Sequence, residues 1–337
     1  MKIIVDCFGG DNAPGEIVKG ALAALNRDAE LKLAFCGDRD KIRDLIKDCG
    51  ENALSRIDII HAPSIITNEE APAAAARSKR DSSLVRGLQT LSDDADADGF
   101  VSAGSTGAVL AAAFMFVGRI KNISRPALAP VLPTVDGGSV ILVDCGANVD
   151  CKPLHLGQFA VMGAAYAEAT GTKNPRIGLL NNGTEAGKGN ELTKEAYDIL
   201  KNLGLNFIGN IEGRDLISGM VQVAVSDGFA GNVALKTAEG IANSIFSLIK
   251  QGVSAGGLRA KIGAALLLPT LKGLKKKLDY NENGGACLLG LKKVVIKAHG
   301  ASKASSVCAS VLQARDIAAG GLIEKIEKGI SDKNQGL

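Results

Sequence analysis

The sequence has no tryptophan, and aromatic residues make up only 4% of its 337 residues. A core built with so few rings must be filled by Ala, Val, Ile and Leu, which is typical of a parallel sheet covered by helices. Few aromatic side chains are available to stack on nucleic-acid bases, and a net charge of +3 is low for a nucleic-acid binder. The composition therefore disfavours nucleic-acid binding and favours a globular α/β protein.

The seven cysteines are odd in number and form no CxxC pair, so we expect reduced thiols and neither a disulfide framework nor a zinc site. Long apolar runs are also missing. The longest stretch without a charged residue is 99–118, and only 108–117 is continuously apolar, which is too short to span a bilayer. The chain begins directly with the strand-like segment 2–7, so no signal peptide is expected. These absences predict a cytoplasmic protein.

Common nucleotide and nucleophile motifs are absent. Residues 183–189 have three residues between the first Gly and the Gly-Lys pair, one fewer than a Walker A loop, and no Ser or Thr follows Lys188. No GxGxxG follows the first predicted strand, and no GxSxG elbow occurs. Cys145 follows a predicted strand, but a small buried side chain is the simpler interpretation than a thiolate nucleophile. We therefore expect no nucleotide, metal or other cofactor.

Strand-like and helix-like segments alternate along the chain. Short apolar runs predict strands at 3–7, 31–36, 56–60, 99–102, 127–133, 140–144, 176–180, 206–209, 221–225 and 294–298. Helical patterns cover 15–26, 39–47, 83–93, 106–119, 153–169, 190–203, 232–250 and 302–328. This order predicts a doubly wound, mostly parallel sheet. We expect one catalytic α/β domain over 1–337, with a helical hairpin protruding at about 252–285.

Glycine-rich and polar loops follow seven of the predicted strands. Because ligands of such a sheet bind at the carboxyl ends of its strands, these loops are the expected substrate site. Loop N–H groups at the start of a helix bind anions, since they have no intrahelical acceptor and the helix dipole favours negative charge. The loops at 102–107 and 183–190 fit this description best. A plain turn between strand and helix is the alternative for either loop taken alone.

Seven stretches of the chain form a recognisable set. They are VDCFGGDNAP (5–14), VSAGSTGAVLAAA (101–113), DCGANVDCKPLHLGQFAVMG (144–163), GKGNELTKEAY (187–197), NFIGNIEGRDLISG (206–219), SDGFAGNVALKTAEG (226–240) and LLGLKKVVIKAHG (288–300). In this order they resemble the signatures of the PlsX family of bacterial phosphate acyltransferases. The resemblance implies acyl transfer from acyl carrier protein to inorganic phosphate, a homodimer, and a fold like that of isopropylmalate dehydrogenase and phosphate acetyltransferase.

Two positions depart from the family pattern. The family usually has His where this chain has Asn12, which argues against an essential general base there. It often has a second Glu where this chain has Thr184, so Glu185 is the only carboxylate in that loop. From the loops and the resemblance together, the candidate substrate-binding residues are Asp6, Gly9, Gly10, Ser102, Gly104, Ser105, Thr106, Gly107, Asn148, Lys152, Gly187, Gly189, Asn190, Asp227 and Lys297.

The chemistry that the resemblance implies asks little of the protein as acid or base. The leaving thiol has a pKa of about 8.5 and departs readily as thiolate, and phosphate is already an anion at neutral pH. The protein must hold the phosphate and stabilise the oxyanion, so we expect direct displacement without an acyl-enzyme. Lys188 is expected to bind the anion and Asn232 to donate to the oxyanion, unless Asn232 only caps its helix. His299 is expected to support positioning at the site.

Residues 256–278 predict an exposed hairpin of two short helical arms that meet at Pro269. The first arm carries an apolar surface that includes Leu266, Leu267 and Leu268. The second arm carries a basic face of Lys272, Lys275, Lys276 and Lys277. Such a surface suits an anionic membrane or an acidic carrier protein, and the next enzyme implied is a membrane glycerol-3-phosphate acyltransferase. The alternative is a dimer-interface hairpin with a solvated lysine face.

Other functions are left open by the residues. A short-chain phosphate acyltransferase that uses a coenzyme A thioester would share the fold. A lipid-binding scaffold without catalysis is the non-enzymatic alternative. A metal-dependent dehydrogenase is disfavoured by the missing nicotinamide fingerprint.

Overall fold

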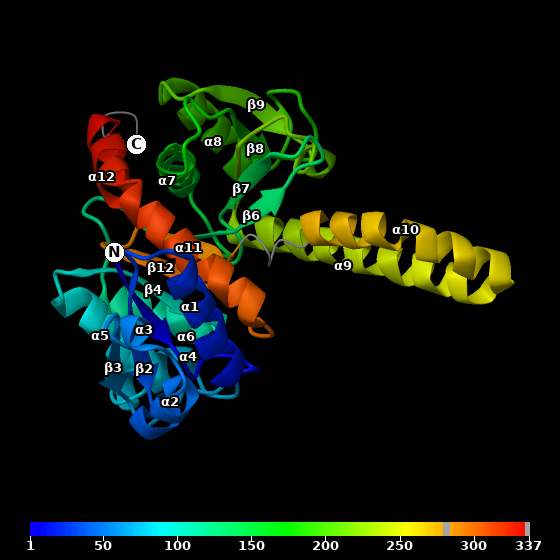
Figure 1. Cartoon of the computed structure of the whole chain (residues 1–337). Coiled ribbons are helices and arrows are strands. Elements are labelled where there is room, and N and C mark those ends of the chain that lie inside the picture. The colour runs from blue at the N-terminus through cyan, green and yellow to red at the C-terminus, as the bar shows by residue number, and fades with distance from the viewer. Residues whose placement is uncertain (279–283, 334–337) are drawn as a thin grey trace.

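A computed structural model gives the fold of the chain and describes residues 1–278 and 284–333, except for the side chains of residues 272 and 274–278. Two sheets with helices packed against them form the body of the molecule, and a long helical hairpin projects from it (Figure 1). The predicted mostly parallel α/β fold is confirmed. The strands divide between the two sheets instead of forming one.

The first sheet has the strand order β3-β2-β1-β4-β12-β11-β5. Its parallel strands are β1 (Lys2–Asp6), β2 (Lys32–Gly37), β3 (Ile57–His61), β4 (Ala97–Ser102) and β12 (Val294–Lys297). The strand β11 (Ala286–Leu289) runs antiparallel to both β12 and β5 (Ala127–Ala129). Ile3, Ile4 and Val5 are fully buried, because helices cover both faces of this sheet.

Helices on the two faces of the first sheet come from distant parts of the chain. On one face lie α1 (Gly15–Arg27) and α11 (Ala304–Ala319), which pack against each other and share a core with Ile3 and Val5. On the other face lie α5 (Ser83–Asp93) and α6 (Thr106–Phe116), which share a core with Ile4, and α4 (Pro72–Ser78) packs on α6. The helices α2 (Arg39–Ile46) and α3 (Glu51–Leu54) lie between β2 and β3 in the chain.

The second sheet has the order β6-β7-β10-β8-β9. The strands are β6 (Val131–Pro133), β7 (Ser139–Val143), β8 (Ile177–Leu180), β9 (Phe207–Ile211) and β10 (Val223–Val225), and only the β6–β7 pair is antiparallel. The helix α7 (Pro153–Ala169) packs on this sheet and is buried from His155 to Ala167. It is covered in turn by α8 (Glu191–Asn202) and α12 (Leu322–Asp332), and a short 3-10 helix, η1, spans Gly213–Asp215.

Two expected elements are divided in the structure, and one strand of the first sheet was not expected. The single strand expected at 127–133 is two strands in different sheets, because Pro130 between β5 and β6 has no N–H to donate to a ladder and the chain crosses there. The helix expected at 302–328 is divided into α11 and α12 at Gly321, whose φ of 67° lies in the left-handed region. The strand β11 was not expected.

The projecting hairpin consists of α9 (Gly228–Ala255) and α10 (Gly257–Leu278). The prediction that 256–278 forms a hairpin by itself is wrong: it is one helix, which continues through Pro269, and its partner is α9. A proline in a solvated helix frees a carbonyl that water can bind, so the helix need not end. Figure 1 shows both helices leaving the body of the molecule side by side.

Leu266, Leu267 and Leu268 of α10 are all exposed, as the sequence predicts. The basic face of Lys272, Lys275, Lys276 and Lys277 lies outside the side chains that the structure describes. Within the described ranges, no helix combines the length and the apolar character needed to cross a membrane.

Candidate active site

A pocket of about 410 Å³ lies where the carboxyl ends of strands from the two sheets face each other. The first sheet contributes the residues after β12 and the start of α6, which follows β4. The second sheet contributes the loop after β7 and the first turns of α9, which follows β10. The polar side chains that line the pocket are Thr106, Asn232, Lys236, Lys297 and His299.

Lys297 ends β12 and is the most buried charged group of the pocket. It lies beside Ser102 in the β12–β4 register, and only 8% of the residue is exposed. Burial lowers the pKa of its ammonium to about 8, and the carboxylates of Asp11 and Asp6 oppose this shift in part. The ammonium donates a hydrogen bond to the Ala298 carbonyl. A weakly hydrated positive charge therefore borders the pocket at neutral pH.

The loop that leads into α6 is held by hydrogen bonds that involve the buried carboxylate of Asp6. The Ser102 hydroxyl donates to Asp6 over 2.7 Å and accepts from the Gly104 N–H over 3.0 Å. A Cβ on Gly9 would lie 2.5 Å from the Asp6 carboxylate, so only glycine fits there. Burial raises the pKa of Asp6 although Ser102 donates to it. These residues shape the loop and do not line the pocket themselves.

The start of α6 faces the pocket without a side-chain cap. Ser105 is the N-cap residue and its hydroxyl makes no capping hydrogen bond, and the next two residues, Thr106 and Gly107, line the pocket. Uncapped N–H groups at a helix start attract anions. Gly10 has a φ of 101° and packs against the carbonyl oxygen of Gly300, which follows β12. This contact places the loop after β1 next to the loop after β12.

Asn232 lies in the second turn of α9, so it does not cap the helix. The cap is Asp227, whose carboxylate accepts from the Ala230 N–H over 2.7 Å. The alternative that Asn232 only caps its helix is therefore excluded. Its amide packs beside Gly146, where a Cβ would lie 3.6 Å from the Asn232 Cγ. Asn232 is exposed and lines the pocket, and no described residue forms a hydrogen bond with its amide, which can therefore donate to a ligand.

The start of α9 is held against the β7 loop. Asn148 donates to the Asp144 carboxylate through its backbone N–H over 2.6 Å and through its Nδ2 over 2.9 Å. The Asn148 carbonyl then accepts from the Gly228 N–H over 2.8 Å. A side chain at Gly231 would collide with the Asp144 carbonyl, so glycine is required at this contact. Asn148 and Asp227 thus position Asn232 and do not line the pocket.

Comparisons with known proteins identify the family of the chain. A family model described as "Fatty acid synthesis protein" matches residues 1–325. The phosphate acyltransferase of Geobacillus thermodenitrificans is 49% identical over 328 residues, covering 97% of this chain and 98% of that protein. The phosphate acyltransferase of Bacillus anthracis is 46% identical over 327 residues, covering 97% of each. The chain belongs to the phosphate acyltransferase family. It is therefore an acyltransferase.

The fold is also similar to those of more distant proteins with solved structures. A phosphotransacetylase from Streptococcus pyogenes matches with a TM-score of 0.65 at 20% identity, over 96% of this chain and 94% of that one. A branched-chain phosphotransacylase from Enterococcus faecalis matches with a TM-score of 0.59 at 14% identity, over 94% of this chain and 99% of that one. At these identities the similarity shows the shared fold.

Lys236 is a pocket residue that the sequence analysis of this phosphate acyltransferase missed. It lies four residues after Asn232 and so on the same face of α9, a spacing that could have revealed it. Its ammonium pairs with Glu239 over 2.9 Å. The other carboxylate oxygen of Glu239 is buried without a hydrogen-bond partner in the described part of the chain. Lys236 therefore brings a second ammonium donor to the pocket, and Glu239 balances part of its charge.

Cys145 is poorly suited to serve as the nucleophile of an acyltransferase. It lines the pocket but is 2% exposed, and burial, with a further contribution from Asp144, raises the pKa of its thiol to about 12. The thiolate is then nearly absent at neutral pH. Among the described residues, no group of three or more His, Cys, Asp or Glu side chains could hold a metal ion.

The remaining predicted residues lie outside this pocket. Lys188 is exposed in the loop after β8, the neighbour of β10, and its carbonyl accepts from Asn181 over 3.2 Å. Gly187 and Gly189 belong to the same loop, and Asn190 caps α8 through the Thr193 N–H over 2.9 Å. Lys152 is the exposed N-cap residue of α7. The roles predicted for these residues stay predictions.

Proposed function

We propose that this acyltransferase moves a fatty acyl group from acyl carrier protein to inorganic phosphate and yields an acyl phosphate for phospholipid synthesis. The observation that carries the proposal is the pocket, where Lys236, Lys297, the Asn232 amide and the uncapped start of α6 converge. Ammonium, amide and helix-start N–H groups are the donors that hold phosphate and stabilise an oxyanion. Membership of the phosphate acyltransferase family supports acyl transfer to phosphate.

The proposed reaction is one direct displacement. A phosphate oxygen attacks the thioester carbonyl carbon, the carbonyl oxygen becomes an oxyanion, and the C–S bond then breaks to release the carrier thiolate, which takes a proton from water. Lys236 and Lys297 hold the phosphate, and Asn232 donates to the oxyanion. His299 helps to position the substrates in the pocket. The high pKa of the Cys145 thiol supports a mechanism without an acyl-enzyme.

The carrier and the membrane are assigned to the outer surfaces of the enzyme. Exposed Lys152 and Lys188 lie in the loops that follow β7 and β8 of the second sheet and suit an acidic carrier protein. The exposed leucines at 266–268 suit an anionic membrane surface, where a membrane glycerol-3-phosphate acyltransferase would take up the product. We propose in addition that the chain is one catalytic domain that acts as a homodimer in the cytoplasm with peripheral membrane contact.

The acyl donor can be tested directly. The purified enzyme is incubated with labelled phosphate and palmitoyl thioesters of either acyl carrier protein or coenzyme A, with acetyl-coenzyme A as the short-chain comparison. Labelled acyl phosphate should form fastest with the carrier thioester, together with phosphate-dependent release of carrier thiol. Preference for acetyl-coenzyme A would favour the short-chain alternative, and thiol release that does not depend on phosphate would reject the proposal.

A further inference from the structure

One wall of the active-site pocket is built from the backbone of Gly284, Gly285 and Ala286. Ala286 pairs with Lys297 as the last pair of the β11–β12 ladder, so Gly285 lies just beyond the end of the ladder. Gly284 has φ of 109°, in the left-handed region. Two successive glycines lose more conformational freedom on folding than other residues. A wall of this kind needs a partner outside the ladder to keep it in place.

Gln313 of α11 provides that partner. Its Oε1 accepts from the Gly285 N–H over 2.8 Å, and its Nε2 donates to the Gly285 carbonyl over 2.9 Å. A carboxamide presents a donor and an acceptor as a peptide group does, so Gln313 pairs with Gly285 as the next residue of a strand would. A Cβ on Gly284 would collide with the Gln313 amide, which explains the glycine at that position.

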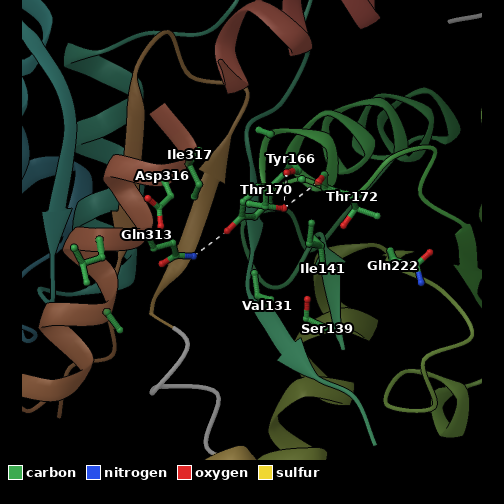
Figure 2. Close-up of a pocket in the computed structure, with 15 residues that line it drawn as sticks. Val131, Ser139, Ile141, Tyr166, Thr170, Thr172, Gln222, Gln313, Asp316 and Ile317 are labelled. Atoms are coloured by element: carbon green, nitrogen blue, oxygen red, sulfur yellow. Dashed lines mark hydrogen bonds between the residues drawn. The ribbon is translucent and has the colours of Figure 1, made fainter. Parts of the chain in front are cut away.

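The amide of Gln313 is itself held in place from α7. Its Nε2 also donates to the hydroxyl of Tyr166 over 2.8 Å, and Figure 2 shows the two side chains meeting between α11 and α7. Tyr166 is fully buried, so it is a rigid support. Gln313 lines a second pocket of about 620 Å³ and is not among the residues that line the active-site pocket. It can therefore affect the reaction only indirectly, through the pocket wall of Gly284 and Gly285.

We propose that Gln313 is a positioning residue for acyl transfer, because its amide holds Gly285 and so keeps the pocket wall closed against the end of β12. The proposal rests on the proposed function of the pocket. Gly285 lies directly against the backbone of Lys297, since a Cβ on Gly285 would be 2.6 Å from the Lys297 carbonyl oxygen. Gly285 and Lys297 also line the same pocket, so loss of the amide should free this wall and open the Lys297 side chain to water.

Two substitutions separate hydrogen bonding from packing. Gln313→Met keeps the length of the side chain and removes both bonds to Gly285, and kcat/KM should fall by about 100-fold, the size of effect expected from a displaced site. Gln313→Glu keeps the acceptor but donates only when protonated, so its activity relative to wild type should rise as the pH falls from 8 to 5. Asp316→Asn, on the same helix and lining only the second pocket, should match wild type.

The alkaline limb of the pH profile gives a readout that a purely structural role would not change. In wild type the limb should follow the Lys297 pKa of about 8. Burial and the charge of Lys236 lower this pKa, and the charges of Asp11 and Asp6 raise it. Gln313→Met should shift the limb upward by about one pH unit or more as water reaches Lys297.

A Gln313→Met variant with wild-type kcat/KM and an unchanged alkaline limb overturns the positioning role. If that variant does not fold, a folded Gln313→Glu variant decides: a constant activity ratio across pH 5 to 8 overturns the proposal as well. Wild-type enzyme without phosphate-dependent transfer overturns the proposed function itself. An active wild type that is inactivated by Lys297→Met but not by Gln313→Met overturns only the role of Gln313.

Discussion

Replacing Lys297 with Met should slow the enzyme and stabilise its fold at the same time. The residue is 8% exposed, and burial lowers the pKa of its ammonium from 10.5 to about 8. Because one pKa unit corresponds to about 1.4 kcal/mol, the buried charge costs the folded state on the order of 3 kcal/mol at pH 7. Methionine fills a similar volume without a charge and removes this cost. Without the ammonium, kcat/KM for phosphate should fall by about 100-fold or more.

The pH dependence of both quantities has a definite sign. Lys297 loses its proton near pH 8 in the folded state and near 10.5 in the unfolded state. Between these values the unfolded chain binds more protons, so this residue makes the free energy of unfolding rise with pH, up to about pH 10.5. Activity moves the opposite way, because the charged fraction of Lys297 falls from about nine-tenths at pH 7 to about one-tenth at pH 9.

The assay measures kcat/KM for phosphate from pH 6 to 10 and the midpoint of thermal unfolding. Lys297→Arg is the matched control, because a guanidinium keeps its charge over this range while the titration of phosphate itself is unchanged. The alkaline decrease of wild type should therefore be absent or much smaller in Lys297→Arg. A Lys297→Met variant that is less stable than wild type, yet as active, would refute the reasoning.

Four further predictions concern the active-site pocket, the carrier-protein surface and the hairpin. Asn232→Ala should lower kcat by about 100-fold through loss of an oxyanion donor. Lys188→Ala should weaken turnover with the carrier thioester through loss of a positive charge that attracts the acidic carrier protein. Folded variants with wild-type rates would contradict these roles. His299→Gln should lower activity but leave the shape of the pH–rate profile unchanged, and loss of an acidic limb would instead identify His299 as a general base. Replacing the three leucines at 266–268 with Gln should abolish sedimentation with anionic vesicles and leave the soluble reaction intact. Dissociation to monomers, or unchanged sedimentation, would contradict a membrane contact at these leucines.

Much of the fold follows from local pattern. Apolar runs such as that of β1 identify strands, because a strand buried on both faces must be apolar at every position. The helix bounds Ser83–Asp93 and Pro153–Ala169 agree with the sequence-based expectation residue for residue. The family resemblance is equally a property of the sequence, since its stretches are recognised by their order along the chain whichever strands are neighbours. The exposed leucines of α10 could also be predicted, because their pattern needs no distant partner.

The composition of the pocket was decided by strand order. The strand β12 inserts between β4 and β11, which brings Lys297 beside Ser102 although the two are far apart in the sequence. The loop of Lys188 has the same local composition as the pocket loops but follows β8 and does not line the pocket. Strand neighbours depend on long-range packing, which no local pattern records.

Sequence alone determined the residue types available at the strand ends, the α/β alternation and the family. Only the tertiary structure decided that Lys236 faces the pocket, that Lys297 is buried enough for its pKa to fall to about 8, and that Gln313 reaches Gly285. The physical reason is that burial and hydrogen bonding depend on which elements pack together. A lysine or glutamine in the sequence specifies only the chemistry of its side chain. The solvent exposure and the hydrogen-bond partners of that side chain depend on how the sheets and helices pack together.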